Sequence, residues 1–342
     1  ANVDQPLAVS MHYGQNQTHD HRDKMQLDIY AHGASLIPDF GYPETANAND
    51  PRRGGFFHHT ISHNTVMVDE RRQQASHEGY CIAFDPGGVC AYMEADGKGA
   101  YPQIDMYRRG VALIEGDDSG DYIIDLFRVQ GGRQHDWLVH GTKATFDSNL
   151  PFSEPRTKGT LAGPEVPYGF FYDDPDIRDL PEGSTNYFRY CGSSFQFLYN
   201  SQEAHLQPDG WVRWTVAPQA EPTLPVHVTA DEGTFLKAHL IGHQEHIFAA
   251  DGKPQQHYDT APESVKFLIR RRVGEQLSSN YATVFEPGAG DSFIDRVTRL
   301  DTGLEHVIAL RILLKSGEVH YYLNAASAVE EHDVADGLRF SG

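Results

Sequence analysis

The sequence predicts an all-β fold, in which several antiparallel sheets stack into one large β-sandwich. Two observations support this fold class. Short runs of alternating or continuous apolar residues recur along the 342 residues, and turn signals rich in Gly, Pro and Asp separate them. In addition, no stretch of 12 residues shows the apolar period of an amphipathic helix. Many short strands at regular spacing are typical of antiparallel sandwiches.

The first predicted strands surround a polar N-terminal region. Residues 6–13 alternate between apolar and polar side chains and predict a strand. Residues 25–32 and 34–37 predict a hairpin that turns at Gly33. Residues 41–55 are rich in Gly, Pro, Asn, Asp and Arg. A loop of this length is often functional, although it can also be a solvated excursion.

The remaining strands are interrupted by a Pro-, Gly- and acid-rich surface excursion at residues 142–187. A composition break at residues 217–225 separates a main sandwich with the candidate site, residues 1–220, from further antiparallel sheets, residues 221–342. The second part can also belong to the same domain. The predicted strands are residues 64–69, 79–84, 89–93, 106–114, 122–129, 137–140, 195–199, 211–216, 235–241, 265–272, 281–285, 306–314 and 319–324.

Charge and composition exclude some classes of function. The formal net charge of −20 argues against binding of nucleic acid through a general positive field. No run of 18 apolar residues is present, so the sequence predicts no membrane span. The N-terminus has neither an initiating Met nor a signal pattern, and we expect a processed or truncated start. Cys81 and Cys90 lie nine residues apart in predicted paired strands, so a disulfide between them is geometrically possible, but the odd count of three Cys favours buried free thiols.

Potential metal ligands gather in the first fifth of the chain. A His-Asp-His-Arg-Asp run places His19 and His21 two residues apart, so an extended backbone would point both to one side, with Asp23 continuing the row. Asp39 follows the predicted hairpin, and His63 precedes the next strand. Imidazole and carboxylate are ligands that zinc prefers. The pattern predicts a metal or catalytic site, with ordinary surface histidines as the alternative.

Arginine doublets are the candidate groups for binding an acidic substrate. Arginine is suited to bidentate contact with carboxylate or sulfate. Of the doublets, we expect Arg52, Arg53, Arg71 or Arg72 to lie near a substrate, and the triplet at residues 270–272 to solvate the face of a sheet. The sequence contains no phosphate-binding glycine loop and no Gly-x-Ser-x-Gly elbow, so it does not support nucleotide binding or a hydrolase triad.

Several motifs follow one another in a specific order. His19-Asp-His-Arg-Asp-Lys24 is followed by Pro38-Asp-Phe-Gly41 and Ser62-His-Asn-Thr65, and residues 127–141 continue with Phe-Arg-Val-Gln-Gly-Gly and His-Asp-Trp. This combination resembles the heparinase II/III-like polysaccharide lyases, which act on heparin, alginate and related uronate polymers. The resemblance is best over residues 16–141.

The resemblance implies that the chain is the C-terminal β-sandwich portion of such a lyase, normally preceded by an (α/α) toroid that is absent from this chain. It assigns His19 to the catalytic cleft. It also assigns His21, Asp39 and His63 to a structural divalent metal, usually Zn²⁺. The metal would hold the loops so that His19 points correctly, as outer-shell groups do in metal sites.

The chain departs from the family pattern in the long loop. Some alginate lyases of the family carry a tyrosine after a Gly-Gly pair, whereas here Gly54-Gly55 precedes Phe56-Phe57. Tyr42 or His58 are the candidates to replace that tyrosine. We therefore expect the substrate-binding residues to be Arg52, Arg53, Tyr42 and His58.

The implied activity is β-elimination at a uronate, with an acidic polysaccharide or oligosaccharide as the substrate and the toroid portion as an intramolecular partner. Because further catalytic residues come from the toroid in the family, we expect this chain alone to fold but to lack activity. The alternatives are a non-catalytic carbohydrate-binding or scaffolding sandwich and a uronate epimerase. We expect a periplasmic or secreted bacterial location, with the cytoplasm as the alternative. A homo-oligomer is compatible with the sequence.

Overall fold

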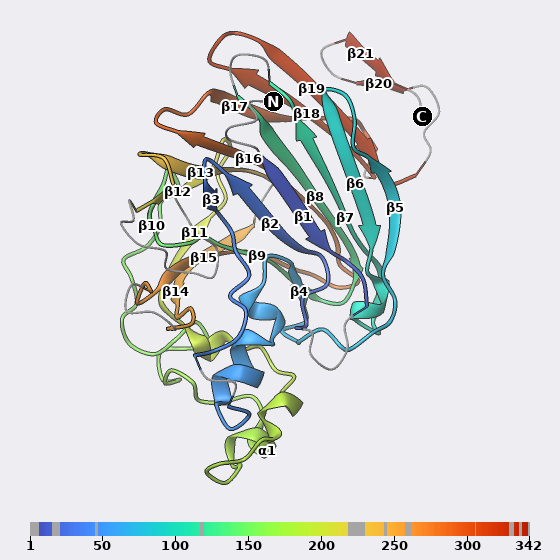
Figure 1. Cartoon of the computed structure of the whole chain (residues 1–342). Coiled ribbons are helices and arrows are strands. Elements are labelled where there is room, and N and C mark those ends of the chain that lie inside the picture. The colour runs from blue at the N-terminus through green and yellow to red at the C-terminus, as the bar shows by residue number, and fades with distance from the viewer. Residues whose placement is uncertain are drawn as a thin grey trace.

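The computed structural model describes residues 7–15, 21–44, 47–116, 120–217, 230–242, 245–256, 261–304, 306–327, 332–334 and 337–340. Within these residues the chain forms stacked antiparallel sheets and short helices, so the predicted all-β class is confirmed (Figure 1). No helix in the described part of the chain is long and apolar enough to cross a membrane.

The largest sheet has eight antiparallel strands in the order β10-β12-β13-β16-β8-β7-β6-β5. Its central strand β8 is buried on both faces, because other layers cover both sides of the sheet. The strands are β5 (Tyr80–Asp85), β6 (Cys90–Asp96), β7 (Ile104–Ile114), β8 (Tyr122–Gly131), β10 (Ala144–Ser148), β12 (Trp211–Val216), β13 (Thr234–Ile241) and β16 (Ser278–Ala289).

A second sheet has five strands in the order β11-β14-β15-β9-β4. Strands from residues 1–220 and from residues 221–342 pair directly in both large sheets, β12 with β13 and β9 with β15. The two ranges therefore share these sheets, while residues 218–225 of the composition break lie outside the described residues. The strands are β4 (Val66–Val68), β9 (Gln134–His140), β11 (Leu198–His205), β14 (His246–Gly252) and β15 (Val265–Val273).

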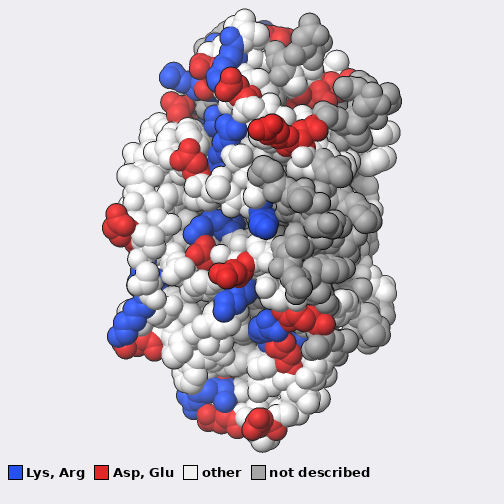
Figure 2. Space-filling model, turned by 60° about the vertical axis from the view of Figure 1, so that its left-hand side comes forward, with Lys and Arg blue, Asp and Glu red and all other residues white. Residues whose placement is uncertain are grey.

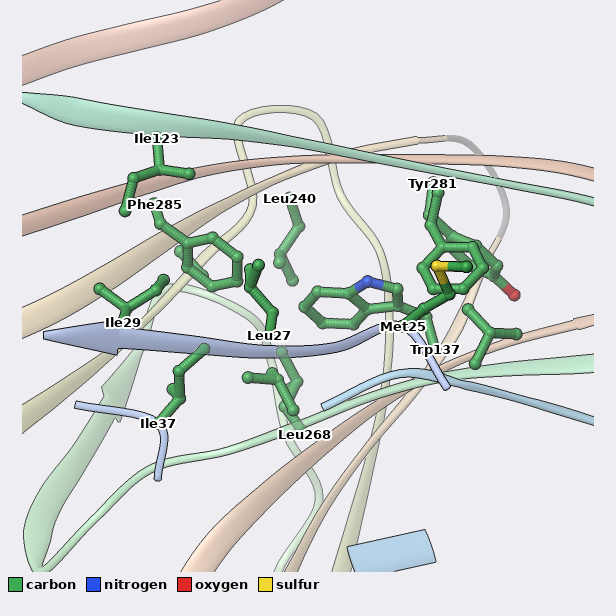
Figure 3. Packing of buried hydrophobic residues seen from close by; sticks show 14 of the residues in the cluster. Met25, Leu27, Ile29, Ile37, Ile123, Trp137, Leu240, Leu268, Tyr281 and Phe285 are labelled. Atoms are coloured by element: carbon green, nitrogen blue, oxygen red, sulfur yellow. The ribbon is translucent and has the colours of Figure 1, made fainter. Parts of the chain in front are cut away.

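A small sheet of β1 (Ala8–His12), β2 (Gln26–Ala31) and β3 (Ala34–Ser35) contributes to the main core between the two large sheets. Leu27 and Ile29 of β2 are fully buried. Figure 3 shows them packed among side chains of the eight-stranded sheet, such as Phe285, and of the five-stranded sheet, such as Leu268. This packing fixes the chain segments on either side of the hairpin.

A third layer covers part of the outer face of the eight-stranded sheet. Strands β17 (Ile294–Leu300), β18 (Val307–Leu314) and β19 (Val319–Ala325) form this sheet. Its apolar residues pack against outward-facing residues of β7, β8 and β16. Near the C-terminus, β20 (His332–Val334) and β21 (Leu338–Phe340) form a separate pair.

Short helices and irregular segments cover the outer face of the five-stranded sheet and build a second, aromatic-rich core. Gly54 and Gly55 allow this close packing, because a Cβ atom at Gly54 would lie 2.6 Å from the backbone of Tyr187 and one at Gly55 would lie 2.8 Å from the Phe171 ring. The helices are η1 (Arg53–Phe57), η2 (Thr60–Ser62), η3 (Lys98–Ala100), α1 (Pro175–Arg178), η4 (Asn186–Arg189) and η5 (Phe195–Phe197).

Some elements differ from the sequence prediction. Strand β10 lies inside the predicted excursion, β14 is rich in Ala and has weak strand propensity, and a register shift between Ile294 and Arg296 disturbs the alternation of β17. The expectation that the arginine triplet solvates a sheet face is wrong for Arg270, which is fully buried. The three cysteines are free thiols, as their odd count predicted, but the expected burial is wrong, because Cys81 and Cys191 are exposed and Cys90 is half-buried.

Candidate functional site

Four potential metal ligands converge beside the small sheet. His21 and Asp23 precede β2, Asp39 follows β3, and His63 lies between η2 and β4. One ligand atom from each lies within 4.8 Å of the others. The structure thus brings the three predicted ligands together and adds Asp23, which the two-residue spacing from His21 had already placed in the same row. We call these four residues the ligand cluster.

The predicted catalytic residue, His19, lies outside the described residues. Its role therefore stays a prediction. In the sequence it is two residues before His21.

The ligand cluster contains buried polar atoms that hydrogen bonds within the cluster leave without a partner and that a divalent cation could bind. His63 Nδ1 is 2.9 Å from Asp39 Oδ2, and His21 Nδ1 is 3.7 Å from Asp39 Oδ1. Yet both ring nitrogens of His63 and Asp23 Oδ1 are buried and form no aligned hydrogen bond with the described residues. A buried polar atom without a partner costs about 1–3 kcal/mol. Two imidazoles and two carboxylates are a donor set that suits zinc.

The electrostatics keep the carboxylates of the ligand cluster ionised. Burial by itself would raise the pKa of Asp39, but His63 and His21 hold it well below its usual range. Burial opposes charge on His63 as well, yet Asp39 and Asp23 raise its pKa. Burial also acts against Asp23, whose pKa is lowered by His12 through a 2.9 Å contact between His12 Nδ1 and Asp23 Oδ2.

Asn64 ties the three ligand-bearing segments together. Its side-chain amide donates to the backbone oxygens of Leu27 and Ile37, at 3.1 and 2.9 Å. Its Oδ1 accepts from the backbone N–H of His140 at 2.9 Å. Because Asn64 follows His63 and is fully buried, these bonds fix the position of His63 relative to the hairpin that carries Asp39.

A second set of buried side chains anchors the same segments to the eight-stranded sheet. Arg109 of β7 donates to the backbone oxygens of Met25 and Asn64, at 2.5 and 2.6 Å, while Asp125 of β8 pairs with its guanidinium at 2.7 Å. Gln73 bonds both the N–H and the C=O of Lys24, at 2.8 and 3.1 Å. Positioning of the ligand cluster therefore depends on groups far away in the sequence.

Three of the four predicted substrate-binding residues gather beside His21. The rings of Tyr42 and His58 lie 5.3 and 4.6 Å from the His21 ring. The Arg53 guanidinium lies 5.5 Å from the Tyr42 ring and 5.2 Å from the ring of Phe188. Burial, together with His21 and Arg53, lowers the pKa of His58 to about 3. Phe188 comes from the predicted surface excursion's C-terminal flank, and no local sequence signal identified it.

The other candidate arginines have different surroundings. Arg52 pairs with Glu44 at 2.6 Å and with Asp50 at 2.9 Å, so two carboxylates already neutralise its charge. Arg72 donates to the backbone oxygen of Phe188 at 2.7 Å and to Cys191 Sγ at 3.3 Å. Arg71 is exposed. The two neighbouring arginines therefore differ: Arg53 lies against the rings of Tyr42 and Phe188, beside the ligand cluster, whereas Arg52 is paired with two carboxylates.

Comparisons with known proteins agree with these motifs. Residues 8–145 match the family model described as Heparinase II/III-like, C-terminal. An alginate lyase of Stenotrophomonas maltophilia (strain K279a) is 26% identical over 144 residues, which are 37% of this chain and 19% of the relative. The resemblance predicted from the sequence is thereby confirmed.

Solved structures share the fold of nearly the whole chain. The heparan sulfate lyase HepC from Pedobacter heparinus superimposes with a TM-score of 0.60 and 11% identity, covering 95% of this chain and 40% of that chain. The heparinase III structure described as the BT4657 gene product gives 0.59 and 11%, with 93% and 39% covered. The chain thus spans about two fifths of the length of these lyases, and about a fifth of the alginate lyase.

Proposed function

We propose, on the premise that residues 8–145 form a heparinase II/III-like C-terminal domain, that this chain is the β-sandwich part of a polysaccharide lyase. Its substrate would be a polysaccharide or oligosaccharide containing uronic acid. The observation that carries the proposal is the convergence of the ligand cluster with Tyr42, Arg53 and His58. The similar lyases are named for acidic polysaccharides, alginate and heparan sulfate, which supports the same class of substrate.

The chemistry of β-elimination explains why such a group of residues is useful. A base removes the proton at C5 of a uronate, and the sugar linked at O4 leaves. The C5 proton is weakly acidic while the adjacent carboxylate is ionised, so the enzyme must stabilise that charge and position a base and an acid. Arg53, held between two aromatic rings, offers a fixed positive charge for the carboxylate.

His19 would act in the cleft, since an imidazole can gain or lose a proton near neutral pH. Further catalytic groups would come from an N-terminal (α/α) toroid joined to this chain. In the ligand cluster, His21, Asp39 and His63 would hold Zn²⁺ with Asp23 as a fourth donor, and the ion would supply a fixed positive centre that ties the three segments together. Asn64 and Arg109 would keep these segments in register without contacting the ion.

The test is formation of unsaturated product by the full-length protein, followed by ultraviolet absorbance, with alginate, heparin and chondroitin as substrates. We expect absorbance to rise with at least one of them. His19→Ala should abolish turnover and leave the metal content unchanged in elemental analysis. The matched control is His77→Ala, which removes an exposed histidine and should retain activity.

The other outcomes separate the alternatives. Inversion at C5 without unsaturated product would identify an epimerase. Binding of the polymers without either reaction would identify a carbohydrate-binding module. If His19→Ala instead loses the metal, the roles assigned to His19 and His21 are interchanged.

A further inference from the structure

Among the described residues, the three-stranded layer covers only part of the outer face of the eight-stranded sheet. There β17 lies against β13, and the half-exposed side chains of β12 (Trp211, Arg213 and Thr215) face outward. A cavity of about 160 Å³ lies here, between β12 and β13 of the large sheet and β17 of the three-stranded layer. Its lining includes Trp211, Lys237 and His239 from the sheet, Asp295 and Arg296 from β17, and Asn149. We call it the ledge cavity.

The ledge cavity lies outside the part of the chain that matches the lyase family, since all its lining residues fall between 149 and 297. Figure 2 shows the side of the molecule turned forward from the left of Figure 1, where β10, β12 and β13 lie. Basic and acidic side chains alternate along the middle of this face. It is therefore not uniformly acidic, in spite of the net charge of −20.

Lys237 is a half-buried cation with few partners. It stands directly opposite Arg213 on β12, and like charges in opposed positions of neighbouring strands repel each other. Its other cross-strand neighbour, Glu286 of β16, is occupied by other donors: His239 Nε2 and Ser292 Oγ, each at 2.9 Å, and the backbone N–H groups of Phe293 and Ile294.

Among the described residues no ion pair includes Lys237. Its ammonium has three donor protons, and the hydrogen bond found for it goes to Ser292 Oγ at 3.1 Å. Burial lowers the pKa of Lys237, Glu286 and Asp295 act in the opposite direction, and Lys315 and Arg213 lower the pKa further. An anion in the ledge cavity would give this ammonium the close ionic partner that no described side chain supplies.

Trp211 gives the ledge cavity a feature of saccharide sites. Its ring lies 5.0 Å from Lys237 Nζ, so an aromatic surface and a cation border the same space. Asp295 on the β17 side adds a hydrogen-bond acceptor suited to hydroxyl groups, and Arg296, which lies 3.6 Å from Asp209, adds a donor. Small-molecule sites combine an apolar surface with a few placed polar groups in this way.

We propose that the ledge cavity binds one acidic sugar residue of the polysaccharide, with its carboxylate or sulfate group on Lys237 and its ring along Trp211. This inference rests on the proposed function only for the class of ligand. It places a second contact with the polymer on the sheet face, formed by residues other than those of the ligand cluster. Such a contact would act through affinity for longer chains, by raising the effective concentration of the polymer.

Intrinsic fluorescence tests the proposal, because Trp211 is the half-exposed one of three tryptophans, while Trp137 and Trp214 are buried. The protein is titrated with oligosaccharides of alginate, which carry carboxylates, of carrageenan, which carry sulfates, and of cellulose, which carry neither. We expect a saturable change with at least one acidic series and none with the neutral one. Trp211→Phe should remove the signal.

Lys237→Met should weaken binding about tenfold or more, as expected for loss of a charged hydrogen bond, whereas Lys237→Arg should retain most of it. Lys158→Met, at an exposed lysine, is the matched control. Calorimetric titration of each variant, checked for an unchanged melting temperature, confirms the affinities. Equal binding of neutral sugars, or unchanged affinity in a folded Lys237→Met variant, would overturn the proposal.

The absorbance assay keeps the two proposals apart. A fluorescence change with acidic oligosaccharides but no unsaturated product would defeat the lyase assignment alone. Unsaturated product without any fluorescence change would defeat the ledge cavity alone.

Discussion

Two of the buried groups of charged residues in the described part of the chain differ in how well their atoms are paired. In the first, Glu245 joins Arg270 and Arg272, with Arg270 Nε 2.6 Å from Glu245 Oε2. Arg270 also donates to Ala282 O and Thr283 Oγ1, each at 2.9 Å, so this ionic cluster is satisfied by its own members and neighbours. In the ligand cluster, by contrast, buried nitrogens of His63 and an oxygen of Asp23 have no aligned partner among the described residues.

This difference distinguishes the structural role of the ionic cluster from the metal-binding role proposed for the ligand cluster. A buried charge is tolerated when it is paired and hydrogen-bonded, as in the ionic cluster. Buried polar atoms that converge and keep some of their bonding capacity unused are the arrangement expected if, as proposed, a cation completes the ligand cluster. Burial and charge alone would not have distinguished the two clusters.

The largest expected effect comes from removing the carboxylate of the ionic cluster. Glu245→Gln leaves Arg270 buried without its counter-charge, and we expect the free energy of unfolding to fall by about 3–5 kcal/mol. Urea denaturation measures it. The control is Glu275→Gln, whose partner Arg133 is exposed, with an expected change below about 1 kcal/mol. Similar losses in both variants would contradict the structural role given to the ionic cluster.

Acid should weaken the same cluster. Burial alone would raise the pKa of Glu245, but Arg270 and Arg272 lower it below the ordinary value of 4.5. The unfolded chain therefore takes up the proton first, so the stabilisation is complete above about pH 4.5 and is lost as the pH falls through the folded pKa. We expect stability to fall less steeply below pH 4.5 in Glu245→Gln than in the wild type. Parallel profiles of unfolding free energy against pH would rule this out.

Removal of the metal proposed for the ligand cluster should lower the stability of the folded protein by a somewhat smaller amount. A ligand that binds only the folded state, present at 100 times its Kd, stabilises by about 2.7 kcal/mol. Addition of EDTA should therefore lower the melting temperature of the wild type. The measurement is calorimetry with and without the chelator, alongside elemental analysis.

Two variants make the EDTA test specific. His63→Ala should bind little metal, and its melting temperature should not respond to EDTA. His140→Gln removes a buried imidazole that stacks on Phe40 but is not a ligand, and it should keep the response. A wild type that contains no divalent ion and does not respond to EDTA would refute the metal assignment.

The sequence predicted the fold class and the grouping of the candidate ligands for reasons that the structure makes clear. Apolar alternation marks strands with one buried face, as in β2, where Leu27 and Ile29 are buried and Asp28 and Tyr30 are less so. His21 and Asp39 could be predicted to meet because they flank one hairpin. His63 was a candidate from its position before the next strand, and the family resemblance then assigned it to the metal with His21 and Asp39 and assigned His19 to catalysis.

Other features depend on contacts between segments that are distant in sequence. Arg109 reaches Met25 from a strand 84 residues away, and Phe188 reaches the Arg53 guanidinium from beyond the predicted excursion. No local pattern records such contacts. The burial of Arg270 was missed for the same reason, because its partner Glu245 lies 25 residues earlier in the chain, directly before β14.

The smallest expected effect separates the two neighbouring arginines of the long loop. Arg52 is paired with Glu44 and Asp50, and partly exposed ion pairs contribute about 0.2–1 kcal/mol, so Arg52→Ala should cost no more than about 1 kcal/mol and leave KM nearly unchanged. Arg53→Ala should leave stability similar but raise KM for the proposed uronate substrate, since Arg53 lies beside Tyr42 and the ligand cluster. Melting temperatures and steady-state kinetics of the full-length protein measure both. If Arg52→Ala raises KM as much as Arg53→Ala does, Arg52 also binds substrate, as the sequence led us to expect, and its pairing with two carboxylates must open when the polymer binds.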